Sequence, residues 1–471
     1  MNVSFPIESG RPYATDVDDD GRSQRTGTLL TATAHIITAV IGCGVLSLAW
    51  AVAQMGWVAG PIVLLIFSLV TLYASTLQTD CYRNPTTGKR NYTYQEAVRS
   101  ILGGRKFKFC GLAQYANFVG VSIGYTITAS ISMAAVKRAI CFHREGHEAG
   151  CHTHNNQFIM IFGVVQLFIS QLPNFHKLSW LSIVAAAMSF GYSFIGIGLA
   201  IAKVAGGSKA RTSLTGVEIG IDVTQAQKVW NILTAMGNMA FAYAFSMVLI
   251  EIQDTLRPNP PENVVMKKAC SYGVLITTFF YMLCGVIGYA AFGNDAPGNF
   301  LTGFGFFEPF WLVALANIFI AIHLVGAYQV FVQPLFDFVE TQCATKWPEN
   351  KFINVEYPTK LPLYGDYNFS FFRLIWRSSY VILMTVIAMI FPFFNDIVGL
   401  IGAFSFWPLT IYFPIEMYIA QGKAGPKYSW SWIFLKLLSY ACLVVSLLAI
   451  VASVRGIVVG VSNMKPFQSV S

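Results

Sequence analysis

Charged side chains are scarce in this 471-residue sequence, where Asp, Glu, Lys and Arg together make up only 11%. Soluble domains carry about 25% of these residues, so a chain of this length has too few charges to cover a soluble fold. Apolar residues reach 55% and aromatic residues 15%. This composition excludes a disordered chain, a disulfide-rich miniprotein and an ordinary soluble enzyme, and it favours an all-α membrane protein with several spans.

The sequence also lacks a basic cluster of the kind that binds nucleic acid. Its formal net charge is +8, but Lys and Arg lie in short segments between apolar runs, where they act as topology signals. We therefore expect a lipid bilayer around the protein and no nucleic-acid partner. No apolar run precedes residue 28, which argues against a cleavable signal peptide, and residues 1–27 are expected to be a disordered cytoplasmic tail.

Long apolar runs fill the rest of the chain, and a spanning helix needs roughly 20 such residues. Eleven runs qualify, so a single transmembrane domain is expected over residues 28–456, followed by an extracellular tail at 457–471. The expected spans are 28–51, 57–79, 110–136, 156–173, 178–202, 229–252, 269–292, 308–333, 371–392, 395–419 and 431–455.

The orientation follows from the placement of Lys and Arg, which concentrate on the cytoplasmic side of membrane proteins. With the N-terminus inside, 22 of the 31 Lys and Arg residues fall in inside segments. The odd number of spans then puts the C-terminus outside.

Cys141 and Cys151 share one expected external loop, at residues 137–155, and a disulfide between them is the favoured interpretation. The other cysteines lie within or beside spans, as small core residues do. The same loop holds four histidines, but their spacing matches no standard zinc site, so no metal is expected.

Two glycines flank Cys43 in the middle of the first span, within the stretch from Ile41 to Val45. Each glycine weakens a helix by about 1 kcal/mol relative to alanine, and backbone groups freed in lipid need protein, water or a ligand as partners. The sixth span carries a comparable stretch of small, polar and aromatic residues at 237–246. A small-residue packing face is the alternative for each stretch taken alone.

Spans one and six are five apart and run in opposite directions, so residues 28–202 and 229–419 are predicted to be inverted repeats, with 431–455 as an extra helix. Two inverted repeats that each open with a broken helix are typical of secondary transporters with a binding site at the midplane. We found no nucleophile with a base, and no metal-ligand set, within the spans, so we expect no enzyme.

A zwitterion fits the chemistry of such a site. Amides at the start of the outer half-helix, from about Gly44, suit a carboxylate, while carbonyls freed around Ile41 and around 240–242 suit an ammonium. The tyrosine of the third span could also hold the carboxylate. The predicted substrate-binding residues are Ile41, Gly42, Cys43, Gly44, Val45, Tyr125, Asn238, Ala240, Phe241, Ala242, Tyr243 and Phe245.

Ionisable residues inside spans are candidates for carrying a coupling proton, because burying them is costly. The candidates are His323, His35 and Glu251, with a neutral histidine bonded to a backbone carbonyl as the alternative for either imidazole. Glu251 and Asp254 close the sixth span on the inside and are also expected to act as inner-gate carboxylates. Arg257, Lys267 and Lys268 are their expected partners.

The long strings at Ala34–Trp57, Ala240–Leu256 and His323–Pro334 closely resemble the plant amino acid permeases, within the amino acid/auxin permease family of the amino acid–polyamine–organocation group. The resemblance implies eleven spans, a five-plus-five inverted repeat of the leucine-transporter type, and alternating access. It also implies symport of protons with neutral and acidic amino acids across the plasma membrane, with no cofactor besides the proton. Cys43 and Asn238 depart from the Ser and Asp expected at these positions.

Three alternatives remain open at this stage. Auxin or another aromatic weak acid is carried by a sister branch of the family, so it is a second candidate substrate. A non-transporting amino acid sensor is the alternative from a different class, and sodium is an alternative coupling ion because small oxygen-bearing residues can hold a cation. A monomer is expected.

Overall fold

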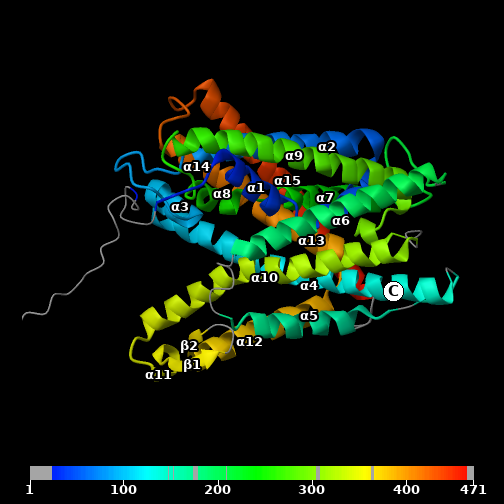
Figure 1. Cartoon of the computed structure of the whole chain (residues 1–471). Helices are drawn as coiled ribbons and strands as arrows, with labels where there is room; N and C mark the ends of the chain where they lie inside the picture. Colours follow the sequence, from blue (N-terminus) through cyan, green and yellow to red (C-terminus); the bar gives the residue numbers. More distant parts are fainter. Residues whose placement is uncertain are drawn as a thin grey trace, which may run out of the picture.

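The computed structural model describes Asp18 and residues 24–146, 148–151, 153–172, 179–207, 209–303, 308–361 and 365–463. Long helices lie side by side along one common direction, and shorter helices lie among them (Figure 1). The helices are α1 (Leu29–Val40), α2 (Leu48–Thr79), α3 (Tyr94–Leu102), α4 (Gly104–Glu145), α5 (Asn155–Ile169), α6 (Ser179–Ala205), α7 (Gln225–Ala242), α8 (Ser246–Gln253), α9 (Glu262–Phe292), α10 (Phe310–Lys346), α11 (Lys351–Asn354), α12 (Phe371–Ile390), α13 (Phe394–Ser405), α14 (Phe413–Ala420) and α15 (Trp430–Asn463).

Short irregular elements complete the described chain. Strands β1 (Tyr357–Leu361) and β2 (Gly365–Phe369) pair as an antiparallel hairpin between α11 and α12. Three tight 3₁₀ turns are η1 (Cys43–Ser47), η3 (Gly293–Asp295) and η4 (Phe300–Thr302). A π-helical turn, η5 (Phe406–Tyr412), joins α13 to α14.

The polytopic all-α fold predicted from composition is confirmed. Among the described residues, nine helical stretches are long and apolar enough to cross a membrane, and α1 and α5 are shorter apolar helices. Expected spans one and two join inside α2 at Gly56, whose φ of 77° departs from the helix. A side chain there would also meet the Gly216 amide nitrogen at 2.2 Å, so only glycine fits. The count of eleven crossings stays a prediction.

Both predicted helix breaks are present. The first half-helix starts at a capping box of Thr28 and Thr31, and it ends at Val40 before the extended residue Gly42. The sixth span is divided into α7 and α8 by residues 243–245. The second break therefore lies just after the 240–242 stretch where we expected it.

Contacts between connecting segments divide them into two groups that match the predicted sides of the membrane. The inside segments meet one another: Arg25 pairs with Glu262 at 2.9 Å, and the Lys423 ammonium donates to the Asp80 carbonyl at 2.7 Å. The outside segments also meet, since the Asn294 amide donates to Asp222 at 2.8 Å. Each group of segments therefore gathers at its own end of the helices.

The two ends of the chain differ in detail from the expected tails. Within the expected tail 1–27, Asp18 and residues 24–27 belong to the described part, and they pack against other segments; residues 1–17 and 19–23 lie outside it. Helix α15 continues past the expected end of the last span, to Asn463, and residues 464–471 lie outside the described part. Cys141 and Cys151 form the expected disulfide. The expected loop 137–155 is wrong at its start, because α4 continues to Glu145 and Cys141 lies near its end.

Candidate functional site

A small cavity lies where the two helix breaks meet. Its volume is about 30 Å³, which is room for on the order of one or two water molecules and too little for an amino acid. The protein is therefore contracted around this site. The lining residues are Ala39, Val40, Gly42, Cys43, Gly44, Asn117, Val121, Tyr125, Phe241, Ala242, Ala244, Met247 and Phe331.

Unwinding of the first helix leaves backbone groups of both polarities beside this cavity. Among the described residues, no backbone carbonyl accepts from the amides of Cys43 and Gly44, and no backbone amide donates to the Ile41 carbonyl. The amides begin η1, where N–H groups point away from the turn and favour an anion. The carbonyl instead favours a cation, so the break offers both ends of a zwitterion a partner.

Two tyrosine hydroxyls bond to the carbonyls of Val40, Gly42 and Ala242 at the helix breaks. The sequence had predicted that carbonyls in these stretches would be free to bind an ammonium. The Tyr281 hydroxyl lies 2.5 Å from the Val40 carbonyl and 2.9 Å from the Ala242 carbonyl. The Tyr192 hydroxyl donates to the Gly42 carbonyl at 3.0 Å. In lipid a freed carbonyl needs such a donor. The expectation of free carbonyls around 240–242 is therefore wrong for Ala242.

The two glycines of the first break have different surroundings. A Cβ added at Gly44 would lie 2.8 Å from the Ala242 Cα, closer than atoms pack, so the two broken helices touch through this glycine. A Cβ added at Gly42 would meet nothing within 4 Å. Gly44 is therefore required for close helix approach, whereas Gly42 faces open space.

Aromatic side chains from three elements form the apolar part of the lining. Tyr125 of α4 and Phe331 of α10 meet edge to face, with ring centroids 5.7 Å apart, and Phe241 of α7 joins them. Phe331 was missed because an apolar residue in an apolar span gives no signal of its own, although His323 in the same span was a candidate. Tyr243 was expected here, but its hydroxyl bonds to Thr278 at 3.1 Å. It does not line the cavity, and neither does Phe245.

Of the remaining predicted substrate residues, Ile41, Val45, Asn238 and Ala240 lie near the breaks but do not line the cavity. The Asn238 amide is fully buried, and neither of its polar atoms has a hydrogen-bond partner among the described residues.

Asn117 of α4 is the polar side chain of the lining that sequence reasoning missed. Its carboxamide oxygen is buried and accepts no hydrogen bond from the described protein. An unpaired buried acceptor costs about 1–3 kcal/mol, so it calls for a partner. A polar residue in an apolar span was the available signal, but other expected spans contain asparagine or glutamine as well.

The three proton candidates have unequal surroundings. His35 lies exposed on the outer face of α1, away from the cavity. His323 is buried, with its Nδ1 3.1 Å from both the Ala185 carbonyl and the Ser189 hydroxyl. Its Nδ1 therefore carries the hydrogen and donates it to the carbonyl. This matches the alternative of a neutral, hydrogen-bonded imidazole.

Glu251 of α8 is partly buried beside the start of α3. One carboxylate oxygen accepts from the Tyr94 amide at 3.2 Å, while the other is buried without a hydrogen-bond partner among the described residues. A charged carboxylate half-satisfied in this way is costly, and protonation removes the charge. Among the three candidates, Glu251 has the surroundings that best suit a proton site.

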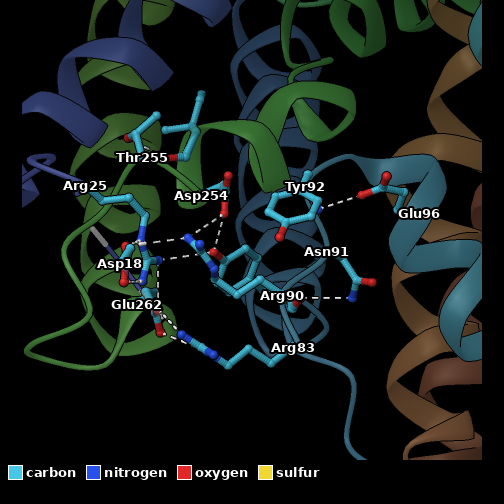
Figure 2. A network of polar contacts seen from close by, with 12 residues as sticks. Asp18, Arg25, Arg83, Arg90, Asn91, Tyr92, Glu96, Asp254, Thr255 and Glu262 are labelled. Atoms are coloured by element: carbon cyan, nitrogen blue, oxygen red, sulfur yellow. Dashed lines mark hydrogen bonds and ion pairs between the residues drawn. The ribbon is translucent and has the colours of Figure 1, made fainter. Parts of the chain in front are cut away.

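An ion-pair network joins the segments that the sequence predicts to be on the inside (Figure 2). Arg25 contacts Asp18 and Glu262, and Arg83 contacts the same Glu262. The Tyr82 hydroxyl donates to Asp254 at 2.5 Å, and burial together with this carboxylate raises the pKa of Tyr82 well above its usual range. The tyrosine therefore stays neutral and donating.

The partners predicted for the inner carboxylates are wrong. Asp254 pairs with Arg90 at 3.3 Å, and Lys267 pairs with Asp80 at 2.6 Å. Neither Arg257 nor Lys268 forms an ion pair with any residue that the structure describes. Nearby position in the sequence was a poor guide because the network joins four separate segments.

Comparisons with known proteins agree with this architecture. Residues 25–459 match the family model described as transmembrane amino acid transporter protein. The chain is 62% identical to amino acid permease 6 of Arabidopsis thaliana, covering 100% of this chain and 98% of the relative. It is 61% identical to amino acid permease 1 of the same plant, covering 98% and 96%. The crystal structure of MhsT in complex with L-phenylalanine matches with a TM-score of 0.55 at 12% identity, over 92% of this chain and 100% of that one, which shows the shared fold.

Proposed function

The chain belongs to the transmembrane amino acid transporter family, and from this premise we propose that it is a proton-coupled symporter importing neutral and acidic amino acids across the plasma membrane. Membership makes it an amino acid transporter and not an enzyme. The coupling ion, the substrate range and the membrane are the proposal. Its main support is the cavity between two broken helices, with backbone groups of both polarities.

The substrate carboxylate is proposed to bind the amides of Cys43 and Gly44. The ammonium would then meet the Ile41 carbonyl and the Asn117 side-chain oxygen, which is otherwise unpaired. A zwitterion loses strong hydration on entry, so both charged ends need such partners. The aromatic lining of Tyr125, Phe241 and Phe331 would surround its side chain, and the cavity has to widen before substrate fits.

The coupling proton is proposed to bind Glu251. Protonation neutralises a buried carboxylate, and deprotonation on the inner side returns it to the ionised form as the inner end opens. The position of Glu251 in α8, next to the ion-pair network around Asp254, supports a link between proton release and opening of that end. His323 remains the second candidate.

The proposed orientation places the Cys141–Cys151 disulfide outside and the ion-pair network inside. A reductant that cannot cross membranes, applied to intact cells, should therefore free these two thiols for labelling. Labelling only after the cells are opened would reverse the orientation.

The test of the proposal is electrical recording from oocytes that express the chain, in sodium-free medium. Alanine, glutamate and lysine are applied at about pH 5.5 and about pH 7.5. Proton-coupled import predicts inward current that is larger at the acid pH for alanine and glutamate. Current that requires sodium, or that indole acetate elicits in place of alanine, would overturn the proposal.

A further inference from the structure

A second cavity lies at the inner end, outside the substrate site and the ion-pair network. Its volume is about 280 Å³, and it is formed where the start of α1 meets the turn from α8 to α9. A backbone bridge fixes its base, because the Gly27 amide donates to the Thr255 carbonyl at 2.9 Å and the Arg257 amide donates to the Gly27 carbonyl at 3.1 Å. The lining residues are Gly27, Thr28, Leu29, Leu256, Arg257, Asn259, Pro260, Val264, Val265 and Lys268.

Two cations line this cavity, and none of the described residues that line it is acidic. Arg257 and Lys268 are exposed, and neither pairs with a carboxylate of the described residues. The neighbouring cations Arg25, Arg83 and Lys267, by contrast, all have acidic partners. Two cations that line one cavity without an acidic partner among the described residues favour an anionic group between them, and a guanidinium matches phosphate with two parallel hydrogen bonds.

An apolar surface continues from the cavity along α9. Lys268, Tyr272, Leu275 and Phe279 share one helix face, and the last three are exposed, Leu275 to 69%. On the other wall, Leu30 of α1 is 78% exposed. In a membrane protein such a face lies against acyl chains, so the cavity sits where the polar headgroup of a lipid would meet its tails.

We propose that this cavity binds the phosphate headgroup of an anionic phospholipid of the cytoplasmic leaflet, held between Arg257 and Lys268 with its acyl chains along α9. The proposal rests on the proposed orientation, which places the cavity on the cytoplasmic side, where anionic lipids concentrate. The cavity joins α1, a half-helix that must move during transport, to α9. A lipid bound there therefore favours the conformation in which these two helices are in contact.

The test uses the full-length protein reconstituted in phosphatidylcholine vesicles that contain a trace of spin-labelled phosphatidylserine or spin-labelled phosphatidylcholine. The motionally restricted fraction of each label measures how much lipid of that class the protein holds. The wild type should prefer the anionic label by about thirtyfold at this site, since two cations near the surface contribute about 1 kcal/mol each. The double variant Arg257→Ala, Lys268→Ala should lose that preference.

A matched control replaces two cations of the same end that lie outside the cavity, Arg99→Ala with Lys351→Ala, and this variant should keep the preference. Inorganic phosphate, added in millimolar excess, separates the two sources of a phosphate group. Lipid binding predicts that it leaves the restricted fraction unchanged, whereas full displacement would identify a site for soluble phosphate and overturn the proposal. Equal preference in the wild type and the double variant would also overturn it.

The same vesicles keep this result separate from the proposed transport function. Lipid preference is read without substrate or proton gradient, so it holds or fails whatever the chain transports. Alanine uptake in vesicles of phosphatidylcholine alone should be equal in the wild type and the double variant, because neither cation touches the substrate site.

Discussion

The Tyr281 hydroxyl lies 2.9 Å from the Ala242 carbonyl, at the end of the first half of the sixth helix. The same oxygen lies 2.5 Å from the Val40 carbonyl, at the end of the first half of the first helix. One phenol of α9 thus joins both breaks, although its single hydrogen can point at only one carbonyl at a time. Movement of either half-helix changes which carbonyl receives it.

Replacing Tyr281 with phenylalanine should slow alanine uptake several-fold with a smaller change in KM. The substitution removes the one donor that these two carbonyls share, at a cost of about 1–3 kcal/mol, while the aromatic ring stays in place. Uptake kinetics in vesicles check this. Tyr272→Phe, an exposed position on the same helix, is the control and should behave as wild type; an unaltered rate in Tyr281→Phe would show that the shared bond is dispensable.

Alanine substitutions at Gly42 and Gly44 should reduce transport to very different extents. Gly44→Ala places a Cβ 2.8 Å from the Ala242 Cα, so the broken helices must separate and transport should fall by more than tenfold. Gly42→Ala meets no atom within 4 Å and should reach the surface and retain most uptake. Surface labelling alongside uptake distinguishes loss of transport from loss of protein. Equal activity of the two variants would contradict the assigned helix contact.

Asn117→Leu should raise the apparent KM for alanine by about tenfold, because the substrate ammonium loses one uncharged acceptor worth about 1–1.5 kcal/mol. Concentration-dependent currents measure this. Gln114→Leu is the matched control, since Gln114 lies one turn earlier on α4 with an unpaired buried oxygen but does not line the cavity. A KM increase in the control alone would place recognition elsewhere on α4.

Glu251→Gln should remove the acid stimulation of uptake. The amide mimics the protonated carboxyl and cannot release a proton, so the current at about pH 5.5 should no longer exceed that at about pH 7.5. Exchange of internal for external substrate, measured without a proton gradient, should persist because it does not require the protein to bind and release a proton. His323→Ala is recorded in parallel: if it loses the stimulation and Glu251→Gln keeps it, the proton site is the histidine.

The buried pair of Arg25 and Glu262 should be needed to close the inner end. Arg25→Ala leaves a buried carboxylate with one cation fewer, and breaking such pairs typically costs about 3–5 kcal/mol. Thermal unfolding in detergent should shift downward, and the charge-swapped variant Arg25→Glu with Glu262→Arg should recover part of the loss. Independent effects of the two single changes, without recovery, would mean that the pair is not coupled.

The sequence alone predicted the two helix breaks because glycine pairs and polar residues in apolar spans violate the rules for a lipid-facing helix. The same rule located Gly42, Cys43, Gly44, Tyr125, Phe241 and Ala242, all of which line the cavity. The disulfide was also predictable, because Cys141 and Cys151 were the two cysteines expected together in one segment outside the spans.

Contacts between distant segments could not be predicted in this way. Phe331 and Asn117 reach the cavity from α10 and α4 through helix packing, which periodicity does not encode. In the sequence, Tyr192 and Tyr281 do not differ from the other aromatic residues of their spans. In the structure, their hydroxyls bond to backbone carbonyls that were expected to be free. The partners of Asp254 and Lys267 were wrong for the same reason, since sequence neighbours at a helix end rarely face each other.

Glycines of α7 and α13 bring these helices into direct backbone contact, because a Cβ at Gly237 would meet the Gly399 carbonyl at 2.4 Å and one at Gly402 would meet the Gly237 carbonyl at 2.1 Å. No side chain stands between them to slide or rotate. The outer half of the sixth helix and the start of the tenth therefore behave as one mechanical part. Residues 243–245 are the non-helical segment that follows this unit, and they separate it from the short helix α8, which carries Glu251.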